Sequence, residues 1–146
     1  FVAWKAEGPD WAARFCADDA RCVAEGIDLA WHVFARDDGG WAGRIDVHTI
    51  DAEAGRGEIG YVGHALRSGQ GLMREAVLLV IEACWDLGFH RIEAMSDARN
   101  TRALRFAESV GLQYEGLLRQ HERDPQGALC DIAIYAVLRP AQRSVC

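Results

Sequence analysis

The sequence predicts one α/β domain with a mixed sheet, and three observations lead to this prediction. The chain has 146 residues, half of them hydrophobic, enough for a core that buries about two-thirds of the unfolded surface. Segments with strand and helix patterns are interleaved along it. No repeat or low-complexity linker interrupts this order. We therefore expect a single domain over residues 1–146.

The first half of the chain contains three β-prone runs and a helix. Residues 28–36 and 41–50 flank Asp-Asp-Gly-Gly and so predict a hairpin. Residues 58–66 predict a third strand. The helix over residues 72–88 carries its acidic side chains on one narrow stripe and is otherwise mostly apolar, so we expect it to be mostly buried.

The second half predicts a strand, a helix and another hairpin. Residues 91–96 are the strand. Residues 100–111 predict a short helix, with Asn100 as its N-cap and Gly111 as its C-terminal stop. Residues 112–123 and 128–138 predict a hairpin around the turn Asp-Pro-Gln-Gly.

Charge and cysteine usage argue against several classes of protein. The formal net charge is −6, Lys5 is the only lysine, and no basic run is present, so we expect no nucleic-acid partner. The five cysteines form no zinc-type spacing, so we expect no metal and a reduced, cytoplasmic setting. No apolar run reaches the roughly 18 residues of a membrane span, and no signal peptide is visible.

A glycine loop precedes the helix over residues 72–88, with Gly69 and Gly71 close together. A Walker A loop would need Gly-Lys-Ser/Thr, and no lysine is near. The dinucleotide pattern Gly-x-Gly-x-x-Gly places Arg74 at its third glycine, although Glu93 lies at a suitable distance for a ribose contact. Two further interpretations remain: a pyrophosphate cradle built from backbone N–H groups and the helix N-terminus, or a tight turn without a ligand.

Several short motifs occur in a characteristic order and spacing. They are Glu-Ile-Gly-Tyr (58–61), Ser-Gly-Gln-Gly-Leu-Met (68–73), Arg-Ile-Glu-Ala (91–94), Asn100 and Gly-Leu-x-x-Glu-Gly (111–116). Residues 41–139 thereby resemble the GNAT superfamily of N-acetyltransferases, and within it the RimJ/RimL type that acetylates protein N-terminal amines. The resemblance implies a mixed, mostly antiparallel sheet with a splayed central strand pair and flanking helices. The family's opening strand pattern has no counterpart, so we expect the domain to lack the first strand and helix.

The resemblance also implies acetyl-CoA as cosubstrate, without a metal. By position, the backbone of Val62, Gly63 and His64 would pair with the pantetheine arm, and Asn100 would contact the same region. The pyrophosphate loop maps to Ser68, Gly69, Gln70, Gly71, Leu72 and Met73. Ser68 stands where the family usually has Arg or Gln, and Arg67 is the expected substitute for that charge.

The implied chemistry is direct attack of a neutral amine on a thioester. Glu122 matches a glutamate proposed in the family to activate the amine, and Glu58, on the strand that holds the cofactor, is the alternative base. His121 precedes Glu122, and only one of the two can face the cleft if the strand is regular. The family's usual proton donors are replaced by Ala103 and Ala107, so neither position can protonate the departing thiolate.

These considerations favour an N-acetyltransferase that acts on a protein or peptide N-terminal α-amine. Such amines have a pKa of about 7.7–8.0, against about 10.4 for lysine, and need only a weak base. A small amine, such as an antibiotic, an aminoacyl compound or a polyamine, is the alternative acceptor. A non-catalytic acyl-CoA-binding module is the second functional class, and a homodimer is compatible with either.

Overall fold

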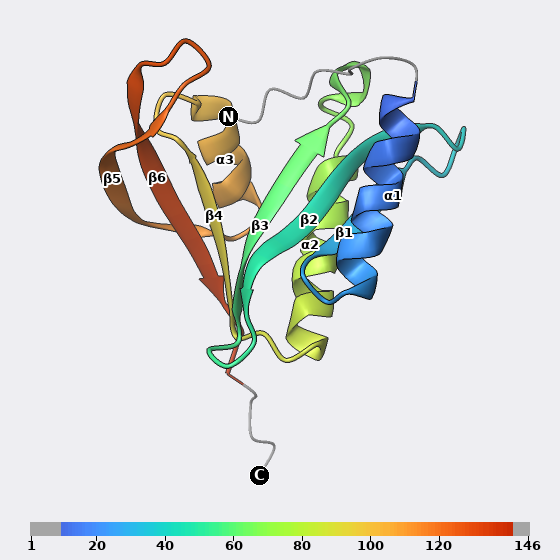
Figure 1. Ribbon diagram of the computed structural model, residues 1–146, viewed down its shortest axis with the longest axis horizontal. Coiled ribbons are helices and arrows are strands. Elements are labelled where there is room, and N and C mark those ends of the chain that lie inside the picture. Colours follow the sequence, from blue (N-terminus) through green and yellow to red (C-terminus); the bar gives the residue numbers. More distant parts are fainter. Residues whose placement is uncertain (1–9, 142–146) are drawn as a thin grey trace.

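The structure, a computed structural model, describes residues 10–141 and consists of a six-stranded sheet flanked by helices (Figure 1). In chain order the elements are α1 (Trp11–Ala24), β1 (Leu29–Phe34), β2 (Trp41–Asp51), β3 (Arg56–Gly63), the 3-10 turn η1 (Ala65–Arg67), α2 (Leu72–Asp86), β4 (Arg91–Asp97), α3 (Thr101–Ser109), β5 (Gln113–Arg123) and β6 (Leu129–Leu138). The predicted α/β class is confirmed.

The strands are arranged in the order β1-β2-β3-β4-β6-β5. Both predicted hairpins, β1–β2 and β5–β6, are present and antiparallel. Strand β3 ends earlier than expected, at Gly63. The His64 N–H still bonds to Ala42 of β2, but the chain then turns, because the Arg67 N–H bonds back to His64 and closes η1. Strands β3 and β4 are the parallel neighbours, joined through α2.

The parallel pair β3–β4 is joined over three residues and then separates. Arg56, Gly57 and Glu58 pair with Arg91, Ile92 and Glu93. Beyond Glu58, β3 stays paired with β2 as far as Gly63, while β4 stays paired with β6 as far as Asp97. The sheet therefore forks at its centre, as Figure 1 shows, and the expected splayed strand pair is present.

The hydrophobic core lies between the sheet and the helices α2 and α3. Ile45, Val47 and Ile59 of the sheet belong to the same buried cluster as Val77 and Ile81 of α2. Because side chains alternate along a strand, Arg44 and Asp46 face the other side of the sheet, where Arg44 is bonded to Asp19 of α1. Figure 1 shows α1 and α2 on opposite faces of the sheet.

Helix α2 is buried on one face only, so the expectation of a mostly buried helix is wrong in part. Val77, Val80, Ile81 and Cys84 are buried. Leu79, on the outer face, is 57% exposed. The helix has the sheet on one side, and within residues 10–141 no layer covers the other.

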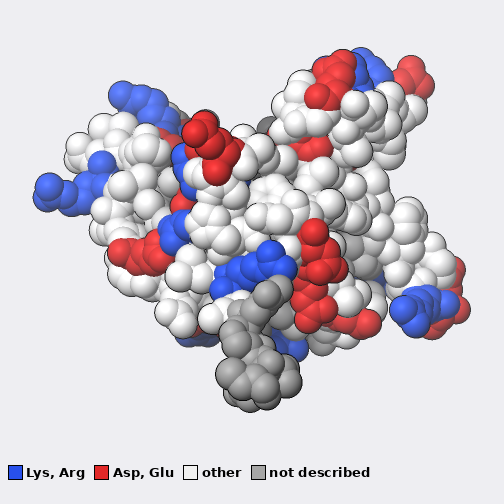
Figure 2. Space-filling model, turned by 90° about the horizontal axis from the view of Figure 1, so that it is seen from below, with Lys and Arg blue, Asp and Glu red and all other residues white. Residues whose placement is uncertain are grey.

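The surface of the described chain carries mixed charge. On the face seen in Figure 2, described basic and acidic side chains lie near one another and no continuous basic area is seen. Such interspersed charges create no strong field of a single sign on that face. No helix within residues 10–141 has the length and apolar character needed to cross a membrane.

Candidate functional site

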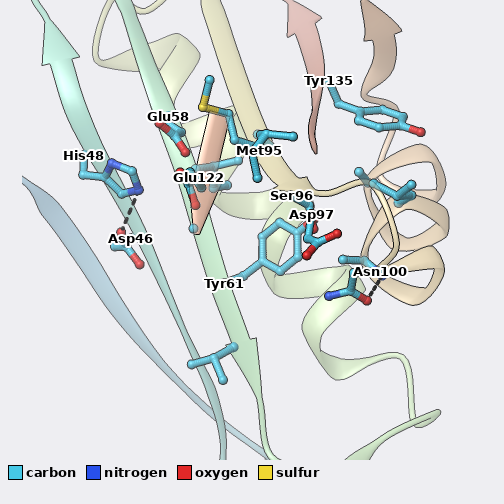
Figure 3. A pocket seen from close by; sticks show the side chains of 18 of the residues that line it. Asp46, His48, Glu58, Tyr61, Met95, Ser96, Asp97, Asn100, Glu122 and Tyr135 are labelled. Atoms are coloured by element: carbon cyan, nitrogen blue, oxygen red, sulfur yellow. Dashed lines mark hydrogen bonds and ion pairs between the residues drawn. The ribbon is translucent and has the colours of Figure 1, made fainter. Parts of the chain in front are cut away.

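A cleft of about 680 Å³ lies at the fork between β3 and β4. Residues 58–62 of β3 and 94–97 of β4 form its two walls. The start of α3 contributes Asn100 and Ala103, and the β5–β6 hairpin contributes Glu122 and Tyr135. Side chains from distant parts of the sequence therefore face one cavity, as Figure 3 shows.

The fork leaves two inner strand edges open. Residues 59–63 of β3 and 94–97 of β4 are paired only on their outer sides, to β2 and β6. Their inward backbone N–H and C=O groups thus have no strand partner within the described chain. An extended ligand with amide groups can bond to such an edge as an added strand does.

The glycine loop lies directly after β3 and η1, at the start of α2. Gly69 and Gly71 have φ of 81° and 79°, and a Cβ atom placed on either would meet nothing within 4 Å. Gly71 is the N-cap of α2 and has no side-chain cap, so the first N–H groups of the helix have no capping partner in the described chain. Open space at both glycines and an uncapped helix N-terminus are features that an anion-binding loop requires.

Two arginines lie beside this loop, Arg67 and Arg102. Arg67 pairs with Asp38 at 2.5 Å, in the β1–β2 turn, and is thus already engaged. Arg102 of α3, which the sequence analysis missed, donates to Ser68 Oγ at 2.5 Å and places a cation beside the loop. The Met73 side chain packs against Gly43 and Gly63.

Two predicted cofactor-binding residues retain unpaired polar atoms. The buried Nδ1 of His64 has no hydrogen-bond partner among the described residues, and its ring lies edge-on to Trp41 with centroids 5.9 Å apart. Asn100 caps α3 through Oδ1, which accepts the Ala103 N–H at 3.2 Å, so the predicted N-cap is confirmed. Its amide nitrogen is left over on the cleft wall. A buried unpaired nitrogen is costly unless a ligand satisfies it.

Glu93, the alternative ribose ligand, lies away from the loop. It pairs in register with Glu58 at the base of the fork and accepts a bond from Arg91 Nε at 2.6 Å. The glycine loop follows the opposite end of β3, after Gly63. This separation disfavours the dinucleotide interpretation.

Glu58 lies on β3 where the strands begin to part, and it lines the cleft. Burial raises the pKa of Glu58, and the charges of Glu93, Glu122 and Asp46 raise it further, whereas His48 opposes them. Figure 3 shows Glu122 near Glu58, from the far side of the cleft. Both candidate bases therefore face the same space, and Glu58 is the more enclosed of the two.

An irregularity in β5 explains why Glu122, rather than His121, lines the cleft. Residues 119–121 of β5 lie opposite the single residue Asp131 of β6, between the pairs Leu118–Ile132 and Glu122–Cys130. Gln120 has φ of 51°, and its N–H bonds to Asp131 Oδ1 at 2.7 Å instead of to a backbone carbonyl. A bulge resets which side chains face inward, so simple alternation could not decide between the two residues.

Two polar residues of β2 that were not predicted from the sequence, Asp46 and His48, line the same cleft. His48 pairs in register with Glu58. Its Nδ1 lies 2.9 Å from Thr49 Oγ1 and its Nε2 lies 3.6 Å from Asp46 Oδ2. Alternation within residues 41–50 could have indicated that both face one side, but not that Glu58 lies opposite.

The cleft contains hydroxyl groups, although alanines stand at the two positions where the resemblance led us to expect proton donors. Ala103 and Ala107 both line it, as do Tyr61 and Ser96. Burial raises the pKa of Tyr61 to about 12, so its hydroxyl stays protonated at neutral pH. Its ring packs on Phe106 of α3 with centroids 4.8 Å apart. Within residues 10–141 no group of three or more His, Cys, Asp or Glu is arranged to hold a metal ion.

Comparison with known families assigns the chain. The family model of the acetyltransferase (GNAT) domain matches residues 4–113. The chain belongs to the GNAT acetyltransferase family. The six-stranded sheet with its central fork is thus the GNAT fold, as the resemblance implied.

This GNAT domain is also similar to a curated relative. It is 36% identical over 98 residues to the uncharacterized N-acetyltransferase p20 of Bacillus licheniformis, covering 66% of this chain and 54% of the relative. The chain thus spans about half the length of that curated relative.

Two solved structures share the fold. The microcin self-immunity acetyltransferase MccE, in complex with acetyl-CoA and AMP, superposes with a TM-score of 0.81 at 22% identity, covering 94% of this chain and 77% of its own. The ribosomal-protein α-N-acetyltransferase RimL, in complex with coenzyme A, gives a TM-score of 0.81 at 18% identity, covering 90% and 73%.

The cleft of this GNAT domain has the donors that acetyl-CoA requires. The two amides of a pantetheine arm match the open edges of β3 and β4, and a pyrophosphate matches the cradle around Gly69 and Gly71. The Asn100 amide nitrogen is a polar atom that the cleft wall offers along this path. The residues present therefore fit the cosubstrate.

Proposed function

We propose that the protein is an N-acetyltransferase that transfers an acetyl group from acetyl-CoA to a primary amine. The observation that carries the proposal is the position of Glu58 at the base of the fork whose open edge leads to the glycine cradle. A carboxylate and a cofactor path thus meet in one cleft.

Acetyl-CoA supplies the activated acetyl group as a thioester, whose carbonyl carbon a neutral amine attacks. The backbone of Val62 and Gly63 orients the pantetheine arm, and Gly69 to Met73 hold the pyrophosphate through N–H groups. The sequence-based expectation also included His64, but its N–H and C=O are engaged by Ala42 and Arg67. An unpaired N–H of β3 between Ile59 and Val62 faces the carbonyl oxygen as negative charge develops there. Arg102, beside Ser68, supplies the positive charge next to the pyrophosphate, because Arg67 is paired with Asp38.

Glu58 is the better candidate for the base. It is only partly exposed, and burial raises its pKa toward the range in which a carboxylate takes a proton effectively. Glu58 accepts one proton from the incoming ammonium, directly or through a water, and leaves a neutral amine. Glu122, which is exposed at the cleft mouth, attracts the ammonium by its charge.

The departing thiolate needs no strong acid, because a thiol of ordinary acidity leaves readily near neutral pH. Ala103 and Ala107 provide no proton. Tyr61, kept protonated by burial, is the hydroxyl donor that the cleft offers in their place. It gives its proton to the thiolate and regains one from the nitrogen, directly or through water, as the nitrogen loses its second proton and the amide forms.

The acceptor that we favour is a protein or peptide N-terminal α-amine, as in enzymes of the RimJ/RimL type. A single half-buried carboxylate suits an amine of pKa about 7.7–8.0 better than a lysine. The fold shared with RimL, an α-N-protein acetyltransferase, is consistent with this choice. A small amine is the second candidate, because the acidic residues around Glu58 suit a compact cation as well.

Thiol release from acetyl-CoA tests the proposal. The purified protein is offered peptides with a free N-terminus, N-terminally blocked peptides that contain lysine, and small amines, including a polyamine. We expect turnover with the free N-termini, lost by 100-fold or more in Glu58→Gln, as for loss of a general base. Glu82→Gln, on the exposed face of α2, is the matched control and should retain activity.

The outcomes separate the alternatives. Turnover confined to small amines would replace the α-amine by the second acceptor class. Tight acetyl-CoA binding without turnover on the whole panel would favour a non-catalytic acyl-CoA-binding module. Full activity of Glu58→Gln would remove Glu58 as the base and leave Glu122→Gln as the next variant.

A further inference from the structure

His48 lines the cleft and has no role in the reaction proposed above. It lies on β2 directly across from Glu58 of β3, and both line the cavity. Residues paired in antiparallel strands project from the same face of the sheet, close enough to interact. The imidazole thus stands next to the proposed base.

The ring of His48 is hydrogen-bonded at one nitrogen and lies near a carboxylate at the other. Nδ1 lies 2.9 Å from Thr49 Oγ1 and Nε2 lies 3.6 Å from Asp46 Oδ2. Thr49 has φ of 50° in an irregular part of β2, a left-handed conformation that is uncommon for a β-branched residue. Such strain persists where surrounding contacts enforce it, and it is often found at functional sites.

Asp46 is itself fixed by a buried arginine. Arg44 donates to Asp46 and to Asp19 of α1, the latter at 2.6 Å and 2.9 Å. The Arg44 side chain is only 10% exposed, so two carboxylates share its charge inside the protein. These contacts fix the Asp46 carboxylate, which lies beside the imidazole of His48.

His48 is the basic residue paired across from Glu58. Arg44 also lines the cleft, but its guanidinium is engaged by Asp19 and Asp46. Asp46 on β2, Glu93 on β4 and Glu122 on β5 all act on Glu58 and favour its neutral form. Asp28, which precedes β1, lines the same cleft. Such surroundings favour the neutral form of a carboxyl group, and a positive partner favours the ionised form.

We propose that His48, held by Asp46 and Thr49 across from Glu58, is a positioning residue that keeps Glu58 ionised and able to take a proton from the amine. The proposal rests on the proposed function in so far as Glu58 is the base. The proton gained by Glu58 comes from the substrate ammonium, and His48 exchanges no atom with the substrate.

A titration that needs no turnover tests the interaction. In protein with ¹³C-labelled glutamate carboxyl groups, the NMR titration midpoint of Glu58 is followed in wild type and in variants. His48→Gln should raise the midpoint by about one pH unit, the effect of removing a neighbouring positive charge. His48→Lys, which restores a charge, should move it back, and Glu122→Gln should lower it.

His121→Gln is the matched control, since His121 is exposed and neighbours Glu122 without lining the cleft. It should leave the midpoint of Glu58 unchanged. The same variants are then compared in the pH dependence of kcat/KM for acetyl transfer. The acidic limb of the profile should move with the NMR midpoint, by about one pH unit toward higher pH in His48→Gln.

The two readouts separate the proposals. An unchanged Glu58 midpoint in His48→Gln overturns the role of His48, whether or not the protein turns over. A shifted midpoint with an unshifted acidic limb overturns it as well, because the interaction would then not affect the reaction. A shifted midpoint in a protein without turnover supports the interaction and counts against the proposed acetyl transfer alone.

Discussion

Gly71→Ala is the sharpest test of the anion cradle, because it adds one methyl group where the phosphates are expected. Gly71 has φ of 79°, and a Cβ at this position meets nothing within 4 Å. The substitution thus causes no internal clash, and its cost to folding is the left-handed conformation, about 1–2 kcal/mol. The methyl group instead points into space that a bound pyrophosphate needs, next to the N–H donors of the loop and of α2.

Gly88→Ala is the matched control. Gly88 follows the other end of α2, has φ of 99° and also has open space around its Cβ position. The two ends lie about 22 Å apart, at 1.5 Å per residue over the helix. Both variants should therefore lose about 1–2 kcal/mol of stability by urea unfolding.

Acetyl-CoA binding, measured by calorimetry, should distinguish the two variants. We expect Gly71→Ala to weaken binding at least tenfold, about 1.4 kcal/mol, and Gly88→Ala to bind like the wild type. If both variants bind acetyl-CoA with the wild-type Kd while both are destabilised, the loop is a tight turn without a ligand. The cradle would then be refuted.

Three further predictions concern the cleft residues. Burial raises the pKa of Glu58, so its neutral form stabilises the fold at low pH, and this contribution is lost as pH rises through the raised pKa. Glu58→Gln should therefore match the wild-type Tm at about pH 4 and exceed it at about pH 8. Arg99, whose side chain and N–H bond to Asp97, lowers the pKa of Asp97 to about 2. That stability is present above the ordinary value and lost as pH falls toward about 2, so Asp97→Asn should lower the free energy of unfolding by about 1–3 kcal/mol at neutral pH and by little in strong acid. Asn100→Ala should lower the free energy of unfolding by about 1 kcal/mol, because the helix loses its cap, and should raise the KM for acetyl-CoA. Asn100→Ser should restore the stability but not the KM. An unchanged KM in both variants would show that Asn100 does not contact the cofactor.

The order of the elements could be predicted from sequence because local patterns dominate them. Turn residues at 37–40 and 124–127 lie between β-prone runs, and both hairpins formed. Asn100 and Gly111 bound α3 closely, since capping depends on residues within one turn. Burial of α2 was less predictable: Leu79 is as apolar as Val80, yet it is exposed because no layer of the described chain covers it.

The sequence by itself determined the family resemblance, the glycine loop and two carboxylates as candidate bases. Each of these depends on a short stretch of sequence and can be recognised without knowing which strand lies next to it. Only the tertiary structure decided which charges meet. The bulge at Gln120 brings Glu122 into the cleft, the β2–β3 register sets His48 opposite Glu58, and the β1–β2 turn engages Arg67 through Asp38. These are contacts between strands and turns far apart in the chain, and their geometry follows from sheet pairing and register shifts, which periodicity alone does not specify.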